Sequence, residues 1–275
     1  MGRAAVVVDT LILKVVLTPA LIGMASLAGR RFGPAVGGWL VGFPLTSAPV
    51  ALFLTLSHGL AFAATAAAGT MAGTVSQAAF CVAYGWLAQH HRWSLPLAGS
   101  TLAFAVSTAA LGRVTLSPVP LFALVVTALA VALYLMPLRG RVPRAARTDG
   151  AGAVAPLGWD LPARMVVATV FVVLLTGIAP ALGPQLTGLL APFPLYGAVL
   201  AVFAHALEGP GPATAVLRGM LTGLFGFAGF FLVLATCLED WGLVAAFAAA
   251  IALTLLVQGL AFWTLERGQA RGRSV

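Results

Sequence analysis

Three side chains in this sequence could take part in proton transfer: His58, His205 and Glu208. His205 precedes Glu208 by three residues, so the two would share one face of a helix. Such a pair could pass protons near neutral pH, because imidazole gains and loses its proton in that range. We predict a proton-coupling role for all three residues. The alternative is that His58 and Glu208 lie in water at the ends of their helices.

A second group of residues surrounds two identical Phe-Pro-Leu triplets, at 43–45 and 193–195. A proline inside a helix removes one backbone donor and clashes with the preceding turn, which leaves carbonyl groups in need of a partner. The hydroxyl groups that follow each triplet could bind a polar group beside the broken backbone. We therefore predict a substrate site that contains Phe43, Pro44, Thr46, Ser47, Phe193, Pro194 and Tyr196. The alternative is that the prolines only kink helices for packing.

Gln77 is a further candidate, because its amide falls deep in an apolar stretch. Thr70, Thr74 and Gln77 recur at helical spacing and share a face with Gly73. We include Gln77 in the predicted substrate site. The alternative is helix packing. Gly73 and Gly223 each complete a Gly-x-x-x-Gly spacing that lets helices approach closely. The hydroxyl groups of Thr70 and Thr74 would then bond within their own helix.

The composition that surrounds these residues is that of a polytopic membrane protein. The chain is 61% hydrophobic and 8% charged, with a mean hydropathy of +1.04, whereas a soluble domain has about 25% charged residues. The net charge of +8 comes from basic residues in the predicted connecting loops. Membrane topology and contacts with anionic lipids explain this charge, so we expect the lipid bilayer as a partner and no nucleic acid.

Nine apolar windows are long enough to cross a bilayer core of about 30 Å, which needs about 20 helical residues. They are 11–28, 34–57, 61–88, 95–112, 118–137, 162–180, 184–207, 213–237 and 241–265. The predicted fold is therefore all-α, with about nine transmembrane helices. The stretch 138–160, with four arginines, predicts a basic cytoplasmic linker between a first membrane half at 1–137 and a second at 161–275.

The basic residues also predict an orientation. With the N-terminus outside, twelve of the fifteen basic residues fall on the inner side, and only Arg3, Lys14 and Arg113 fall outside. The opposite orientation inverts this distribution. Because cytoplasmic loops carry an excess of Lys and Arg, we predict that the N-terminus is outside and the C-terminus is cytoplasmic.

The two Phe-Pro-Leu triplets belong to an internal repeat. A shift of 150 residues aligns 11–84 with 161–234 without a gap and gives 18 identities in 74 pairs, many of them glycine, proline or phenylalanine. Five predicted spans separate the two starts, so the second copy enters the membrane from the opposite face. Inverted repeats of this kind are typical of secondary transporters, whose sites lie near the bilayer midplane where helices are broken.

The second copy, at 193–219, resembles the GlpM family of small bacterial inner-membrane proteins. The resemblance rests on Phe193-Pro194, Ala204-His205, Gly209 and Leu217-Arg218. The first copy keeps Phe43-Pro44 and Gly59 but has Thr55 in place of the histidine. The resemblance implies a duplicated and fused relative in the bacterial inner membrane, and it supplies no substrate.

The sequence predicts a secondary transporter or exporter of a small, weakly polar or amphipathic solute, which moves by alternating access about the two breaks. The runner-up is a non-transporting scaffold or accessory subunit of a cell-envelope pathway. We expect no enzyme, cofactor or metal site, because the sequence has no nucleotide-binding loop, metal-ligand spacing or nucleophile-base arrangement. Cys81 and Cys237 lie in apolar segments and are predicted to be packing residues.

Overall fold

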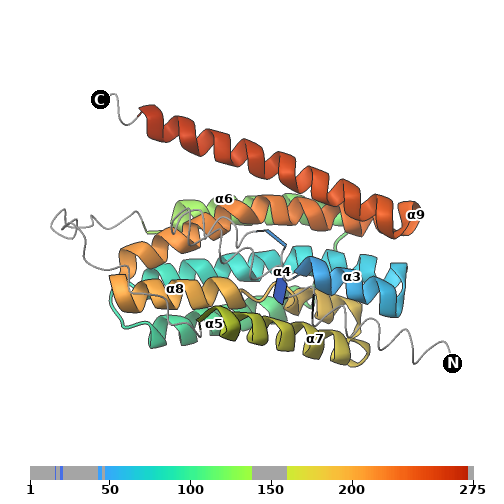
Figure 1. Ribbon diagram of the computed structural model, residues 1–275, viewed down its shortest axis with the longest axis horizontal. Coiled ribbons are helices and arrows are strands. Elements are labelled where there is room, and N and C mark those ends of the chain that lie inside the picture. The colour runs from blue at the N-terminus through green and yellow to red at the C-terminus, as the bar shows by residue number, and fades with distance from the viewer. Residues whose placement is uncertain (1–15, 17–18, 21–42, 45–46, 138–159, 272–275) are drawn as a thin grey trace.

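The computed structural model of the chain describes residues 16, 19–20, 43–44, 47–137 and 160–271. Over these residues the protein is all-helical, with seven helices and the turns between them (Figure 1). The helices are α3 (Ser47–His58), α4 (Leu60–Leu87), α5 (Ser94–Leu111), α6 (Pro118–Leu135), α7 (Asp160–Leu190), α8 (Leu195–Glu208) and α9 (Pro210–Arg271). Five of them, α4, α5, α6, α7 and α9, are long and apolar enough to cross a membrane.

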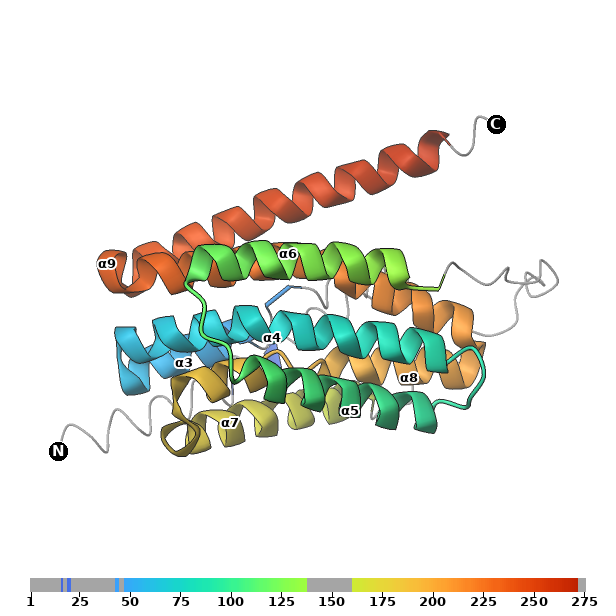
Figure 2. The ribbon, with the colours of Figure 1, turned by 180° about the vertical axis from the view of Figure 1, so that it is seen from behind.

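Four glycines with positive φ mark the sharp turns of the described chain. Gly59 (φ 89°) separates α3 from α4, and Gly209 (φ 93°) separates α8 from α9. Gly183 (φ 75°) and Gly242 (φ 73°) lie inside α7 and α9 and divide each into two arms. Residues with a Cβ rarely adopt such φ values, so glycine is needed at these turns. The arms of α9, before and after Gly242, run in opposite directions (Figures 1 and 2).

Helix α4 forms the centre of the bundle. It packs against α3, α5, α6, α7 and α9, and 72% of its most apolar window is buried, against 22% for the windows of α5, α6 and α7. Its sequence is rich in alanine and glycine, which allow helices to approach closely. The outward faces of α5, α6 and α7 instead expose side chains such as Leu102, Val119 and Val170, as expected of helices that face lipid.

Most of the predicted helices coincide with observed ones. The windows 61–88, 95–112 and 118–137 match α4, α5 and α6, and the last four windows fall on α7, α8 and the two arms of α9. The window 11–28 lies largely outside the described residues, as do the first part of 34–57 and nearly all of the linker 138–160. A total of nine spans therefore stays a prediction.

The two shortest helices run in opposite directions from the middle of the molecule. Helix α3 runs from the middle to one end and α8 from the middle to the other end (Figures 1 and 2). Each is followed by a helix that returns along the length of the bundle, α4 after α3 and the first arm of α9 after α8. These two returning helices are antiparallel, and α4 packs against α9.

Candidate functional site

The second Phe-Pro-Leu triplet interrupts a helix. The short second arm of α7 ends at Leu190, and α8 begins at Leu195. In between, the Phe193 N–H bonds to the Leu190 carbonyl at 3.1 Å and the Leu195 N–H to the Phe193 carbonyl at 2.7 Å. Pro194 is buried, caps α8 and accepts a hydrogen bond from the Ala198 N–H at 2.7 Å. We call residues 191–194 the second break.

The first triplet has the same hydrogen bond at the equivalent position. Pro44 is buried, and its carbonyl accepts from the Ala48 N–H at 2.7 Å, immediately before α3. Pro49 lies in the first turn of α3, where its missing N–H would have no partner within the helix. We call Phe43 and Pro44 the first break. Thr46 lies outside the described residues, and the side chain of Tyr196 is not among those described.

One hydrogen bond joins the start of α3 to the second break. The buried Ser47 Oγ donates to the carbonyl of Ala191, 144 residues away, at 3.1 Å. An interrupted helix leaves carbonyl groups without their usual partners, so this bond satisfies one that the second break frees. Ser47, a predicted site residue, therefore binds protein backbone in this state of the molecule.

The glycines of α4 receive the short arm of α7, residues 184–190. A Cβ added at Gly69 would lie 2.6 Å from the Gln185 carbonyl oxygen, and one at Gly73 would lie 2.7 Å from that of Leu189. A Cβ at Gly188 would overlap the backbone of Ala66. These distances are too short for any side chain, so the glycines of α4 serve close helix packing, the alternative set out above.

Gln77 lies between α4 and α9. Its amide is 4% exposed, its Nε2 faces the sulfur of Met220 at 3.8 Å, and its Oε1 has no hydrogen-bond partner among the described residues. Thr70 and Thr74 donate to carbonyl groups of their own helix, at 2.9 Å and 3.2 Å. An unpartnered buried amide oxygen is unfavourable by about 1–3 kcal/mol. Gln77 therefore keeps an unsatisfied acceptor, whereas the hydroxyl protons of the two threonines are already bonded within α4.

His205 has a partner that the sequence reasoning missed. Its Nδ1 lies 3.4 Å from the hydroxyl oxygen of Tyr84, a fully buried side chain of α4. Glu208, at the end of α8, is exposed. The signal for Tyr84 was present in the sequence, because a buried tyrosine hydroxyl in an apolar helix usually finds a polar partner.

His58 lies far from the other two predicted proton-coupling residues. It packs on Phe62, with ring centroids 4.8 Å apart, at the end of α3. That end and the end of α8, which carries His205 and Glu208, are at opposite ends of the bundle (Figure 2). The structure therefore does not bring the three residues together, and they cannot form one local relay.

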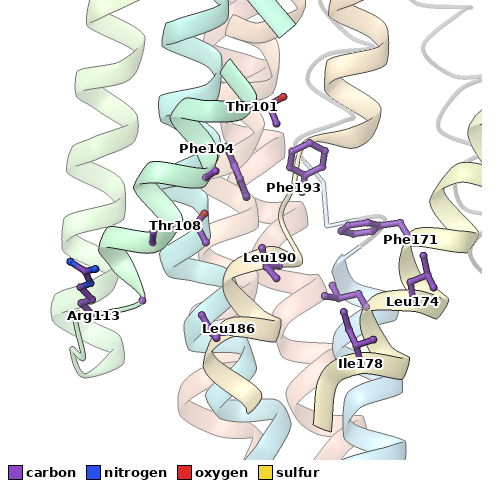
Figure 3. Close-up of a pocket in the computed structure, with 14 residues that line it drawn as sticks. Thr101, Phe104, Thr108, Arg113, Phe171, Leu174, Ile178, Leu186, Leu190 and Phe193 are labelled. Atoms are coloured by element: carbon purple, nitrogen blue, oxygen red, sulfur yellow. The ribbon is translucent and has the colours of Figure 1, made fainter. Parts of the chain in front are cut away.

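A groove of about 670 Å³ opens between α5 and α7, with the short arm of α7 at its base (Figure 3). Of the predicted site residues whose side chains the structure describes, only Phe193 lines it, edge-on to Phe104 at a centroid distance of 5.2 Å. The other lining residues are mostly aliphatic or small: Thr101, Ala105, Thr108, Ala109, Gly112, Arg113, Phe171, Leu174, Leu175, Ile178, Leu186 and Leu190. No local pattern in the sequence indicates this groove, because two helices distant in the chain form it.

The described part of the chain contains no cluster of side chains that could bind a metal ion. No group of three or more His, Cys, Asp or Glu side chains comes together there. Cys81 is buried and Cys237 half-buried, and both are free thiols.

Comparisons with protein-family models, with curated proteins and with solved structures find no match for this chain. The resemblance of residues 193–219 to the GlpM family stays an expectation from the sequence.

Proposed function

We propose that this chain is a secondary transporter or exporter of a small, weakly polar or amphipathic solute, which moves by alternating access about the two breaks. One observation carries the proposal: the buried prolines Pro44 and Pro194, 150 residues apart, accept the same backbone hydrogen bond at the start of α3 and of α8, and Ser47 of α3 donates to the Ala191 carbonyl of the second break. Broken helices in equivalent positions are the usual framework of transporter sites.

The proposal includes two inverted repeats, which several matching features support. Helices α3 and α8 both end at a positive-φ glycine, Gly59 and Gly209. Helix contacts also recur with the same shift of 150: Thr108 bonds to Ser76 at 2.9 Å, and the equivalent position, Gln258, packs on Gly226. The opposite directions of α3 and α8 agree with an inverted relation (Figure 2).

The breaks provide a physical means for movement. Residues 191–194 lack a continuous helical ladder, so α8 can tilt against the short arm of α7 with little loss of backbone bonding. The short arm itself is held against the glycines of α4. We expect α4 and this arm to stay fixed while α8, and by analogy α3, change angle.

We also propose that the protein lies in the bacterial inner membrane with its C-terminus in the cytoplasm, because this orientation places most of the basic residues on the cytoplasmic side.

Cysteine accessibility tests alternating access without knowledge of the substrate. Ser47→Cys would be made in a chain that carries Cys81→Ala and Cys237→Ala, and membrane-impermeant thiol reagents would be applied to either side of oriented vesicles. We expect the introduced cysteine to be labelled from each side of the vesicle. When the protein is trapped in the state open to one side, labelling from the opposite side should fall. Labelling from neither side, or from one side only, contradicts alternating access and favours the scaffold.

Proline substitutions test whether the breaks themselves matter. In Pro44→Ala and Pro194→Ala, helical hydrogen bonds can form across each break, so we expect a loss of transport that exceeds any loss of thermal stability. Pro137→Ala, just after α6, is the matched control. The measurement is uptake of a panel of labelled amphipathic and small neutral solutes into proteoliposomes. Unchanged transport in both break variants would assign the prolines to packing.

A further inference from the structure

We infer that the groove between α5 and α7 binds one single-chain anionic amphipath from the surrounding bilayer, with its head group at Arg113 and its chain directed toward Phe193. This inference names the substrate class of the proposed transporter and rests on the proposed function only in that respect. The binding itself can be tested without any transport.

The wall of the groove excludes polar ligands. Its two threonine hydroxyl groups have no donor to spare: Thr101 donates to the Leu97 carbonyl at 2.8 Å, and Thr108 donates to Ser76 at 2.9 Å. The remaining lining residues, apart from Arg113, have apolar side chains. A sugar or another hydroxyl-rich solute would lose its hydrogen bonds to water here and gain few in return. A hydrocarbon chain meets no such penalty.

The groove opens toward lipid. Leu174, Ile178 and Leu186, which line it, are 59%, 50% and 43% exposed, and they belong to a helix long and apolar enough to cross a membrane. Figure 3 shows the side chains of α5 and α7 facing one another across the groove. A ligand dissolved in the bilayer can therefore enter sideways, without crossing water.

The dimensions of the groove fit a single chain. Thr101 and Arg113 are twelve residues apart, which corresponds to about 18 Å along a helix. One leaflet of a bilayer core is roughly 15 Å thick. The volume of about 670 Å³ lies within the range of sites that hold one small ligand, about 300–1,000 Å³.

The charge of Arg113 indicates which head group the groove can bind. Arg113 is exposed in the turn after α5, and none of the described residues that line the groove is acidic. A guanidinium group binds phosphate and carboxylate groups through paired hydrogen bonds. At the other end of the groove, Phe193 belongs to the second break. A chain anchored at Arg113 would therefore reach the part of the protein that we propose to move.

The test uses photo-crosslinking in nanodiscs of zwitterionic lipid. The probe is a lysophosphatidylglycerol with a diazirine in its chain, and unlabelled lysophosphatidylglycerol and lysophosphatidylcholine of the same chain length compete with it. We expect saturable adducts on α5 and α7. We expect the anionic competitor to be on the order of fivefold more effective than the zwitterionic one, as one interfacial arginine predicts. Equal competition by both overturns the assignment of Arg113.

Matched variants locate the site. Ala109→Trp places a large ring in the groove, whereas Ala110→Trp, its neighbour on α5, lies outside the lining. We expect the first to lower adduct yield at least tenfold and the second to leave it unchanged. Ala105→Phe serves as a second blocking variant should Ala109→Trp fold poorly. Adducts that persist in both blocking variants overturn the inference.

The charge variants follow the same design. Arg113→Gln should weaken probe binding on the order of fivefold, and Arg92→Gln, in the turn between α4 and α5, should not. Adducts in the groove, together with Ser47→Cys labelling from one side only, would leave the binding site intact and reject transport. Alternating access without adducts would reject the groove and leave transport intact.

Discussion

The contact between the short arm of α7 and α4 offers the most direct test of how this bundle is held together. A Cβ at Gly188 would overlap the Ala66 carbonyl oxygen and lie 2.9 Å from the Gly69 Cα, against an ordinary contact distance of 3.4 Å or more. All of these neighbours are backbone atoms, which cannot rotate away. Gly188→Ala therefore forces the two helices apart, and such overpacking usually lowers the free energy of unfolding by about 1–3 kcal/mol.

Gly177→Ala is the matched control on the same helix. A Cβ there meets nothing within 4 Å, and Gly177 is exposed. Alanine should then stabilise the helix by about 0.5–1 kcal/mol, because glycine loses more backbone freedom on folding. The difference between the two variants, measured by reversible unfolding in mixed detergent micelles, should reach roughly 1.5–4 kcal/mol. If Gly188→Ala proves as stable as Gly177→Ala, the close approach of α4 and α7 is wrong.

Three further predictions use the same unfolding measurement or a topology assay. The Oε1 atoms of Gln77 and Gln258 both lack a described partner, but only Gln258 donates a short hydrogen bond, at 2.7 Å, to the Gly223 carbonyl. Gln77→Met should therefore leave the protein more stable than Gln258→Met does, by about 1 kcal/mol, and the reverse order would show that Gln77 has a partner. Tyr84→Phe should lower the free energy of unfolding by about 0.5–1.5 kcal/mol through loss of the contact with His205, and no change would mean that the contact is not a hydrogen bond. Reporter fusions at the two termini should report from opposite sides of the membrane, and reports from the same side would exclude nine spans.

Local features of the sequence predicted the helices and the interruption at the second triplet. The length of each apolar run sets whether a helix can cross a bilayer, and α4, α5 and α6 begin and end within two residues of their predicted windows. Proline acts on its own backbone and on the preceding turn, so Pro194 was enough to predict an interruption before Leu195. The glycine spacing of α4 also indicated close packing, because the absence of a side chain is itself local information.

Tertiary structure alone decided which residues meet. Apolar side chains suit both lipid and protein, so hydrophobicity does not tell which face of a membrane helix is buried. For this reason the sequence could not show that Ser47 bonds to Ala191, that Tyr84 contacts His205, or that His58 lies at the opposite end of the bundle. The groove arises in the same way: α5 and α7 each present an ordinary apolar face, and only their placement beside the second break forms the groove.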